Sequence, residues 1–177
     1  MVVVQRTGYR VGQFGRALAP WVPERDLALA AALLTPTQLA AFQRLPAADQ
    51  RHAARVARAL LAADTCDPDL LVAALLHDLG KVAEAGRGRV WLPHRVANVL
   101  LARWWPAAWR WLSDRPRSGP ALGCYLLRHH AALGAAWAAR LGVSSRACQL
   151  IAAHQAGTVA PDLLPALAQL RQVDDRS

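Results

Sequence analysis

The sequence predicts an all-α protein with a single compact domain. Ala and Leu, which lead the helix-propensity ranking, dominate its apolar residues, while β-branched residues are sparse and no alternating Val/Ile/Thr run occurs. With 177 residues and a hydrophobic content of 54%, the chain is long enough for one full core and too short to favour two. We therefore expect a helical bundle without a sheet.

The N-terminal part is expected to be an arm followed by packing helices. Residues 1–20 contain three Gly and no sustained periodicity, so we expect a short arm there and a helical domain over 21–177. The next segment, ERDLALAAALLTPTQLAAFQRL, predicts two helices separated at Thr35, which can cap the second one, with Pro36 at its first position.

The most apolar stretch, LLVAALLHDLGKV, predicts a central helix. Asp67-Pro68-Asp69 supplies an N-cap, a proline suited to the first turn and an acidic residue favourable to the helix dipole. Gly80 is expected to end the helix in the left-handed conformation, which places His77 and Asp78 in the last turn. Because the helix is apolar all round, we expect other elements to cover it on every side.

The rest of the chain also predicts helices, with a loop at DRPRSGP. Gly142 and Gly157 are expected to end two of them, and Ser144 or Ser145 to cap the second. In chain order these helices are expected from Pro93-His94 towards Trp104, over 121–142, over 143–157 and over 161–177.

The charge balance favours anionic ligands. The formal net charge is +9 and comes almost entirely from Arg, since Lys81 is the only lysine. Such a field attracts phosphates, nucleotides or nucleic acid, although a basic surface without a function is an equal alternative.

Cysteine usage and hydropathy favour a cytoplasmic protein without a transmembrane segment. Cys66, Cys124 and Cys148 are far apart, have no C-x-x-C spacing and follow no secretory signal pattern. The longest apolar region, VANVLLARWWPAAWRWL, is interrupted by Arg103, Pro106 and Arg110. Its four tryptophans leave a membrane-surface helix open as an alternative to ordinary packing.

Asp78 follows a buried helix, so its carboxylate requires a cation or hydrogen-bond donors beside it. A buried carboxylate without a partner costs several kcal/mol or becomes protonated. The negative end of the helix dipole adds to its attraction for positive charge. A divalent metal beside His77 and Asp78 meets these demands.

Other inward-facing His and Asp residues are candidate ligands. His52 shares a stripe with Val56 and Leu60, and His154 and His130 lie at helical offsets from apolar residues. His129 competes with His130, whereas Asp174 lies on the stripe of Leu167 and Leu170 and is favoured over Asp175. Each residue alone has a structural explanation, but their number predicts a metal site.

Imidazoles and carboxylates suit Mn, Fe, Co, Ni or Zn, and Mg less well. A divalent ion of this kind activates water and stabilises negative charge on phosphoryl oxygens, so the pattern favours metal-assisted hydrolysis.

Five segments in order, RHAARVARAL, LLHDLGK, HAALGAAWAARLG, IAAHQAG and LRQVDD, resemble the HD-domain superfamily of metal-dependent phosphohydrolases. The resemblance covers roughly residues 46–177. LLHDLGK is similar to the H-D-x-G-K signature, and an earlier His and a late Asp complete the H…HD…D order. The N-terminal helices are similar to those of small single-domain bacterial members.

The resemblance implies site residues and roles. His52, His77, Asp78 and Asp174 are expected to hold one metal, and His130 and His154 match second-metal positions in two-metal branches, with Asp78 bridging. Lys81 matches the signature lysine, which contacts a substrate phosphate or assists the attacking water. A solvent-facing charge is the alternative for Lys81.

Two departures from the pattern of the family argue against a cyclic dinucleotide as the substrate. The G-Y-P signature of members that cleave cyclic dinucleotides is absent, and Gln155 stands where a second His often follows His154.

His94 is an additional candidate for binding a metal or the anion of the substrate, although a surface His at a helix start is the alternative. His129 is a further candidate for substrate binding.

The sequence thus predicts a cytoplasmic hydrolase with one or two divalent metal ions. Asp78 and Lys81 would be catalytic, and water activated at the metal would cleave a phosphate ester or anhydride, with a nucleotide favoured as substrate. The phosphate could also contact arginines such as Arg87, Arg89, Arg95 and Arg128. The alternatives are a non-catalytic metal- or nucleotide-binding regulatory module and a basic nucleic-acid-binding protein.

Overall fold

The computed structural model describes residues 21–86, 88–156 and 160–176, and this part of the chain is helical throughout its regular structure. It contains no strand, only an isolated bridge between Val82 and Arg89, so the predicted all-α class is confirmed. The predicted arm at 1–20, Arg87 and the expected helix end at Gly157 lie outside the described residues. The helices are Glu24–Leu33 (α2), Pro36–Phe42 (α3), Ala47–Ala62 (α4), Pro68–Leu76 (α5), Leu92–Trp104 (α6), Pro106–Ser113 (α7), Ala121–Arg140 (α8), Ser145–Ala153 (α9) and Leu164–Asp174 (α10), with short 3-10 turns at Leu79–Lys81 (η1) and Pro161–Leu163 (η2).

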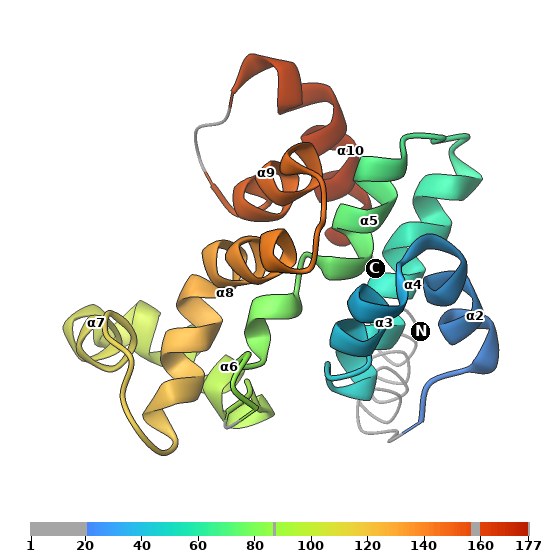
Figure 1. Ribbon diagram of the computed structural model, residues 1–177. Helices are drawn as coiled ribbons and strands as arrows, with labels where there is room; N and C mark the ends of the chain where they lie inside the picture. Colours follow the sequence, from blue (N-terminus) through green and yellow to red (C-terminus); the bar gives the residue numbers. More distant parts are fainter. Residues whose placement is uncertain (1–20, 87, 157–159, 177) are drawn as a thin grey trace, which may run out of the picture.

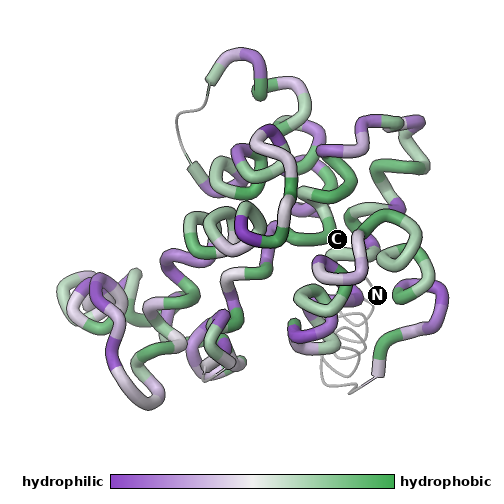
Figure 2. Tube along the Cα trace, in the orientation of Figure 1, coloured by the Kyte–Doolittle hydropathy of each residue, from purple (hydrophilic) through white to green (hydrophobic). Residues whose placement is uncertain are grey.

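Helix α5 forms the centre of the core, as predicted. Six of its nine residues are buried, and it packs against α4 and α9, with smaller contacts to α2 and α10. Figure 1 shows it between these helices, and most of its trace is hydrophobic in Figure 2. The Asp67 side chain accepts hydrogen bonds from the backbone N–H groups of Asp69 and Leu70, which confirms the predicted cap.

The prediction that Gly80 is left-handed is wrong. The helix ends at Leu76, and Gly80 lies in η1 with a φ that is not positive. A Cβ atom at this position would lie 2.1 Å from the backbone oxygen of His130 and 2.6 Å from the backbone nitrogen of Gly134. Glycine is therefore required because η1 crosses α8 at backbone contact, which is a tertiary cause and not a local one.

The other helix boundaries follow local chemistry. Thr35 caps α3 and Ser144, not Ser145, caps α9. Gly142 has a φ of 73° directly after α8, which confirms its predicted role. Two elements were not predicted as such: α7, which begins at Pro106, and the division of the C-terminal helix into η2 and α10.

A search of the described helices finds none with the length and apolarity needed to cross a bilayer.

Candidate metal centre

Six of the sequence-predicted residues converge at one place from helices distant in the sequence. His77 and Asp78 lie at the junction of α5 and η1, and the others come from α4, α8 and the ends of α9 and α10. Their potential ligand atoms form two groups, and within each group these atoms lie within 4.8 Å of one another. The first group is His52, His77 and Asp174, and the second is Asp78, His130 and His154.

The first group is open to solvent on one side. The distance from His52 Nε2 to Asp174 Oδ1 is 2.7 Å, and His77 Nε2 lies 3.6 Å from the same oxygen. The His77 side chain is 2% exposed, but His52 and Asp174 are 23% and 30% exposed. A small solute can therefore approach this group past His52 and Asp174.

The second group is enclosed, and Asp78 connects it to the first. Asp78 Oδ1 lies 3.5 Å from His130 Nε2, while Asp78 Oδ2 lies 3.5 Å from His77 Nε2. His154 lies against both His77 and His130, with ring centroids 5.3 and 5.2 Å apart. The two carboxylate oxygens of Asp78 thus face different ligand groups.

Three histidines of the two groups, His77, His130 and His154, are anchored by the same type of hydrogen bond. In each of them Nδ1 lies within hydrogen-bond distance of the backbone oxygen three residues earlier, at 2.9 Å for His77, 2.8 Å for His130 and 2.6 Å for His154. A carbonyl can only accept, so Nδ1 carries the hydrogen and the neutral ring leaves a lone pair on Nε2. This is the tautomer in which Nε2 binds a metal while Nδ1 is anchored.

His130 Nε2 is the atom of these groups whose surroundings leave it unpaired. It is buried and has no hydrogen-bond partner. Buried polar atoms in proteins nearly always have a partner, because an unpaired one costs about 1–3 kcal/mol. A cation between Nε2 and Asp78 Oδ1 would satisfy both atoms, so the residues present fit a divalent metal.

The surroundings favour the protonation states that bind metals. Burial lowers the pKa of His130, and it lowers the pKa of His154 to about 4, with His77 adding to the effect at His154. Burial opposes ionisation of Asp78, but His77, Lys81 and His130 outweigh it and hold the pKa of Asp78 far below its usual range. At neutral pH these imidazoles are therefore neutral and this carboxylate is charged.

Lys81 points into the site. Its side chain is 13% exposed, and Nζ lies 2.5 Å from Asp78 Oδ2. The alternative of a solvent-facing charge at Lys81 is therefore wrong. Nζ also lies 3.9 Å from Asp49 Oδ1, which in turn lies 2.5 Å from Arg95 Nη2.

Sequence reasoning missed Asp49. It is buried on α4, three residues before His52, so it occupies the adjacent turn on nearly the same side of the helix. The helical spacing from His52 is the signal that could have identified it.

His94 and His129 are not brought into either group. His94 Nδ1 accepts a hydrogen bond from the Trp91 backbone N–H, and Nε2 donates to the Pro120 carbonyl at 2.8 Å. His129 Nε2 lies 3.0 Å from the Ser113 carbonyl oxygen, at the contact of α7 with α8. Both rings connect helices, and their expected roles in substrate binding are unsupported by these contacts.

Two further sequence alternatives are resolved by position. His130 is buried and belongs to the second ligand group, and His129 does not. Asp174 belongs to the first ligand group, while Asp175 is exposed.

Of the described arginines considered for phosphate binding, Arg95 pairs with Asp49, Arg128 pairs with Asp114, and Arg89 lies over the Trp91 ring.

Fold and site together define an all-α protein with a buried His/Asp cluster that has the composition and geometry to hold divalent metal. Comparison of the chain with protein-family models, curated proteins and solved structures finds no match.

Proposed function

We propose that this protein is a metal-dependent phosphohydrolase that cleaves a phosphate ester or anhydride, with a nucleotide as the favoured substrate. The observation that carries the proposal is the position of Asp78, whose two oxygens face two ligand groups while His130 Nε2 lacks a partner. The H…HD…D order of the HD-domain resemblance supports it, since the residues of that order lie side by side.

The donor set indicates the kind of metal. Imidazole nitrogens and carboxylate oxygens suit Mn, Fe, Co, Ni or Zn better than Mg, which prefers an all-oxygen shell. The first group would hold one ion through His52, His77 and Asp174, and the second would hold another through His130 and His154, with Asp78 between them. When bound, a divalent ion supplies a water of lowered pKa and stabilises negative charge on a phosphoryl oxygen.

The remaining residues bind and orient the substrate. Lys81 carries the one ammonium group at the site and lies beside Asp78 Oδ2, which supports the proposal that its Nζ contacts a phosphate oxygen of the substrate. Asp49 and Asp78 hold Lys81 from two sides and fix its position. The partly exposed His52 and Asp174 mark the side from which a phosphate would enter. The net charge of +9 favours an anionic substrate.

The test is phosphate release from a panel of nucleotides, with and without Mn²⁺ and with chelator. We expect release that vanishes with chelator, returns with a preferred metal and is lost in Asp78→Ala. Asp174→Asn should also lose activity, while Asp175→Asn, its exposed neighbour, should retain it. Metal or nucleotide binding without turnover would instead support a non-catalytic regulatory module.

Nucleic-acid binding gives a different result. Binding of RNA or DNA through arginines would weaken steeply with salt and persist after metal removal. No phosphate release that depends on Asp78 would overturn the proposed function.

A further inference from the structure

Helix α6 is amphipathic, but its apolar side faces solvent. None of its 13 residues is buried, although the helix contacts α7 and α8. Leu92, Val96, Leu100 and Trp104 follow one another at intervals of four residues and are 48%, 48%, 40% and 61% exposed. Residues at this spacing lie on one side of a helix, so they form a continuous apolar stripe.

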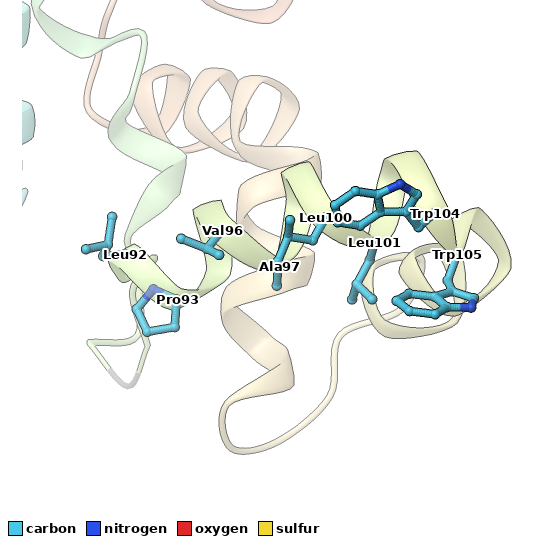
Figure 3. A pocket seen from close by; sticks show the side chains of 8 residues that line it. All are labelled: Leu92, Pro93, Val96, Ala97, Leu100, Leu101, Trp104 and Trp105. Carbon is cyan, nitrogen blue, oxygen red and sulfur yellow. The ribbon is translucent and has the colours of Figure 1, made fainter. Parts of the chain in front are cut away.

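The stripe lines a shallow groove of about 620 Å³ that extends to Trp105, directly before α7. Every residue lining the groove is apolar, and all of them come from 92–105. Figure 3 shows these side chains along α6, with α8 behind the helix. Trp105, which lines the groove, and Trp111 on α7 are each 63% exposed. We call the groove, together with the exposed Trp91 and Trp111, the tryptophan face.

The charge around the tryptophan face is mostly positive. The carboxylate of Asp49, which pairs with Arg95 of α6, is buried. From residue 85 to 161 the sequence contains a single acidic residue, Asp114, and its carboxylate is paired with Arg128 at 3.1 Å. Arg103 and Arg110 are exposed on α6 and α7. Two further arginines lie over tryptophan rings, Arg89 over Trp91 at 3.7 Å and Arg117 over Trp111 at 4.0 Å.

We propose that the tryptophan face binds the surface of an anionic lipid bilayer. The aliphatic stripe would enter the boundary of the acyl chains, the tryptophans would lie at the level of the headgroups, and the arginines would contact lipid phosphates. A 13-residue helix lying in the plane of the interface suits this role, while no described helix is long and apolar enough to cross the membrane.

Charge and side-chain chemistry favour this occupant over two others. A second copy of the chain would bring two arginine-rich surfaces together, which like-charge repulsion opposes. A nucleic acid would meet the arginines and tryptophans, but Leu92, Val96 and Leu100 offer nothing to phosphates or base edges. The proposal does not depend on the metal site or on hydrolysis.

The test is co-sedimentation of the full chain with vesicles of phosphatidylcholine alone, or of phosphatidylcholine and phosphatidylglycerol in equal amounts. We expect binding to the anionic vesicles only, weakened by salt and unchanged by chelator. Trp104→Ala should lower the partition coefficient by about tenfold, because an inserted tryptophan removes a large apolar area from water.

A matched control is available in Trp21, which is 62% exposed and lies before α2, outside the tryptophan face. Trp21→Ala should leave vesicle binding unchanged. Arg103→Gln and Arg110→Gln should each reduce binding to anionic vesicles by about fivefold, in line with ~1 kcal/mol for each cation near a charged leaflet.

Four results would overturn the proposal. The first is no binding to anionic vesicles, and the second is an equal loss of binding in Trp104→Ala and Trp21→Ala. The third is a dimer in analytical ultracentrifugation that Trp104→Ala converts to monomer, which would assign the face to a second copy. The fourth is binding of an oligonucleotide, lost in Trp104→Ala, by a protein that does not bind vesicles.

Discussion

His130 Nε2 and Asp78 Oδ1 face each other at 3.5 Å in the interior of the protein, and the nitrogen has no hydrogen-bond partner. Because Nδ1 of His130 is anchored on the Leu127 carbonyl, Nε2 presents a lone pair to a negative carboxylate. Two electron-rich atoms held together in this way are repulsive without a cation between them. This pair is the physical basis of the metal assignment.

Metal removal should destabilise the protein. A metal at a concentration about a hundred times its dissociation constant adds about 2.7 kcal/mol to the free energy of unfolding. For a domain of this size, that corresponds to a fall in Tm on the order of 5–10 °C when chelator is added. Calorimetry with chelator and after return of Mn²⁺ measures this shift, and a Tm unaffected by either would contradict metal binding to the folded protein.

Lys81→Met should reduce turnover without removing metal. The substitution takes away the cation beside Asp78 Oδ2 but leaves all six candidate ligands in place. We expect kcat/KM for phosphate release to fall by about 10²-fold, comparable to the loss of one charge-stabilising donor. Metal content, measured alongside, should be unchanged. Loss of metal in this variant would show that Lys81 positions the metal ligands and would contradict its role in contacting the substrate.

Gly80→Ala should be strongly destabilising. Its new Cβ would meet backbone atoms of His130 and Gly134, which cannot move without separating η1 from α8. We expect a loss on the order of 3 kcal/mol or more in urea unfolding.

The control for Gly80 is Gly119→Ala. A Cβ there meets nothing within 4 Å, although φ is 69°, so only the backbone cost of about 1 kcal/mol applies. Equal effects of the two substitutions would contradict the close approach of η1 to α8.

Asp67 should contribute stability that disappears in acid. Burial would raise the pKa of Asp67, but Arg146 and the N–H groups of Leu70 and Asp69 together lower it. A carboxylate with a lowered pKa stabilises the fold above its unfolded pKa, and this contribution is lost as the pH falls through the folded pKa.

The corresponding variants separate the cap from the ion pair. Asp67→Ala should cost about 1 kcal/mol at neutral pH through loss of the helix cap, and Asp67→Asn should cost less because the amide still caps. The difference between Asp67→Asn and wild type in the free energy of unfolding should shrink as the pH is lowered from neutral towards 3. A difference that grows in acid would contradict the assigned role of Arg146.

The sequence predicted those features that depend on local chemistry. Thr35 and Asp67 cap helices through their own side chains, and the apolar spacing correctly placed His52 and Asp174 on the sides of their helices that face His77. Contacts between distant helices were not predictable in this way. Gly80 is constrained by α8, which lies some fifty residues further along the chain.

Contacts between distant helices also explain why some candidate residues lie outside the cluster. Helical spacing shows on which side of a helix His94 and His129 lie. It does not show that a ring nitrogen of each is hydrogen-bonded to a backbone carbonyl of another segment. The spacing from His52 could have identified Asp49, but its contacts with Lys81 and Arg95 depend on how other elements pack.

The central claim, that these six residues form a divalent-metal site, is tested most directly by elemental analysis of the purified protein. We predict one or two equivalents of a transition metal per chain in wild type and in Asp175→Asn, and loss of that metal in folded Asp78→Ala. Wild-type protein that is folded, supplied with Mn²⁺ and Zn²⁺ and still free of bound metal would contradict the account.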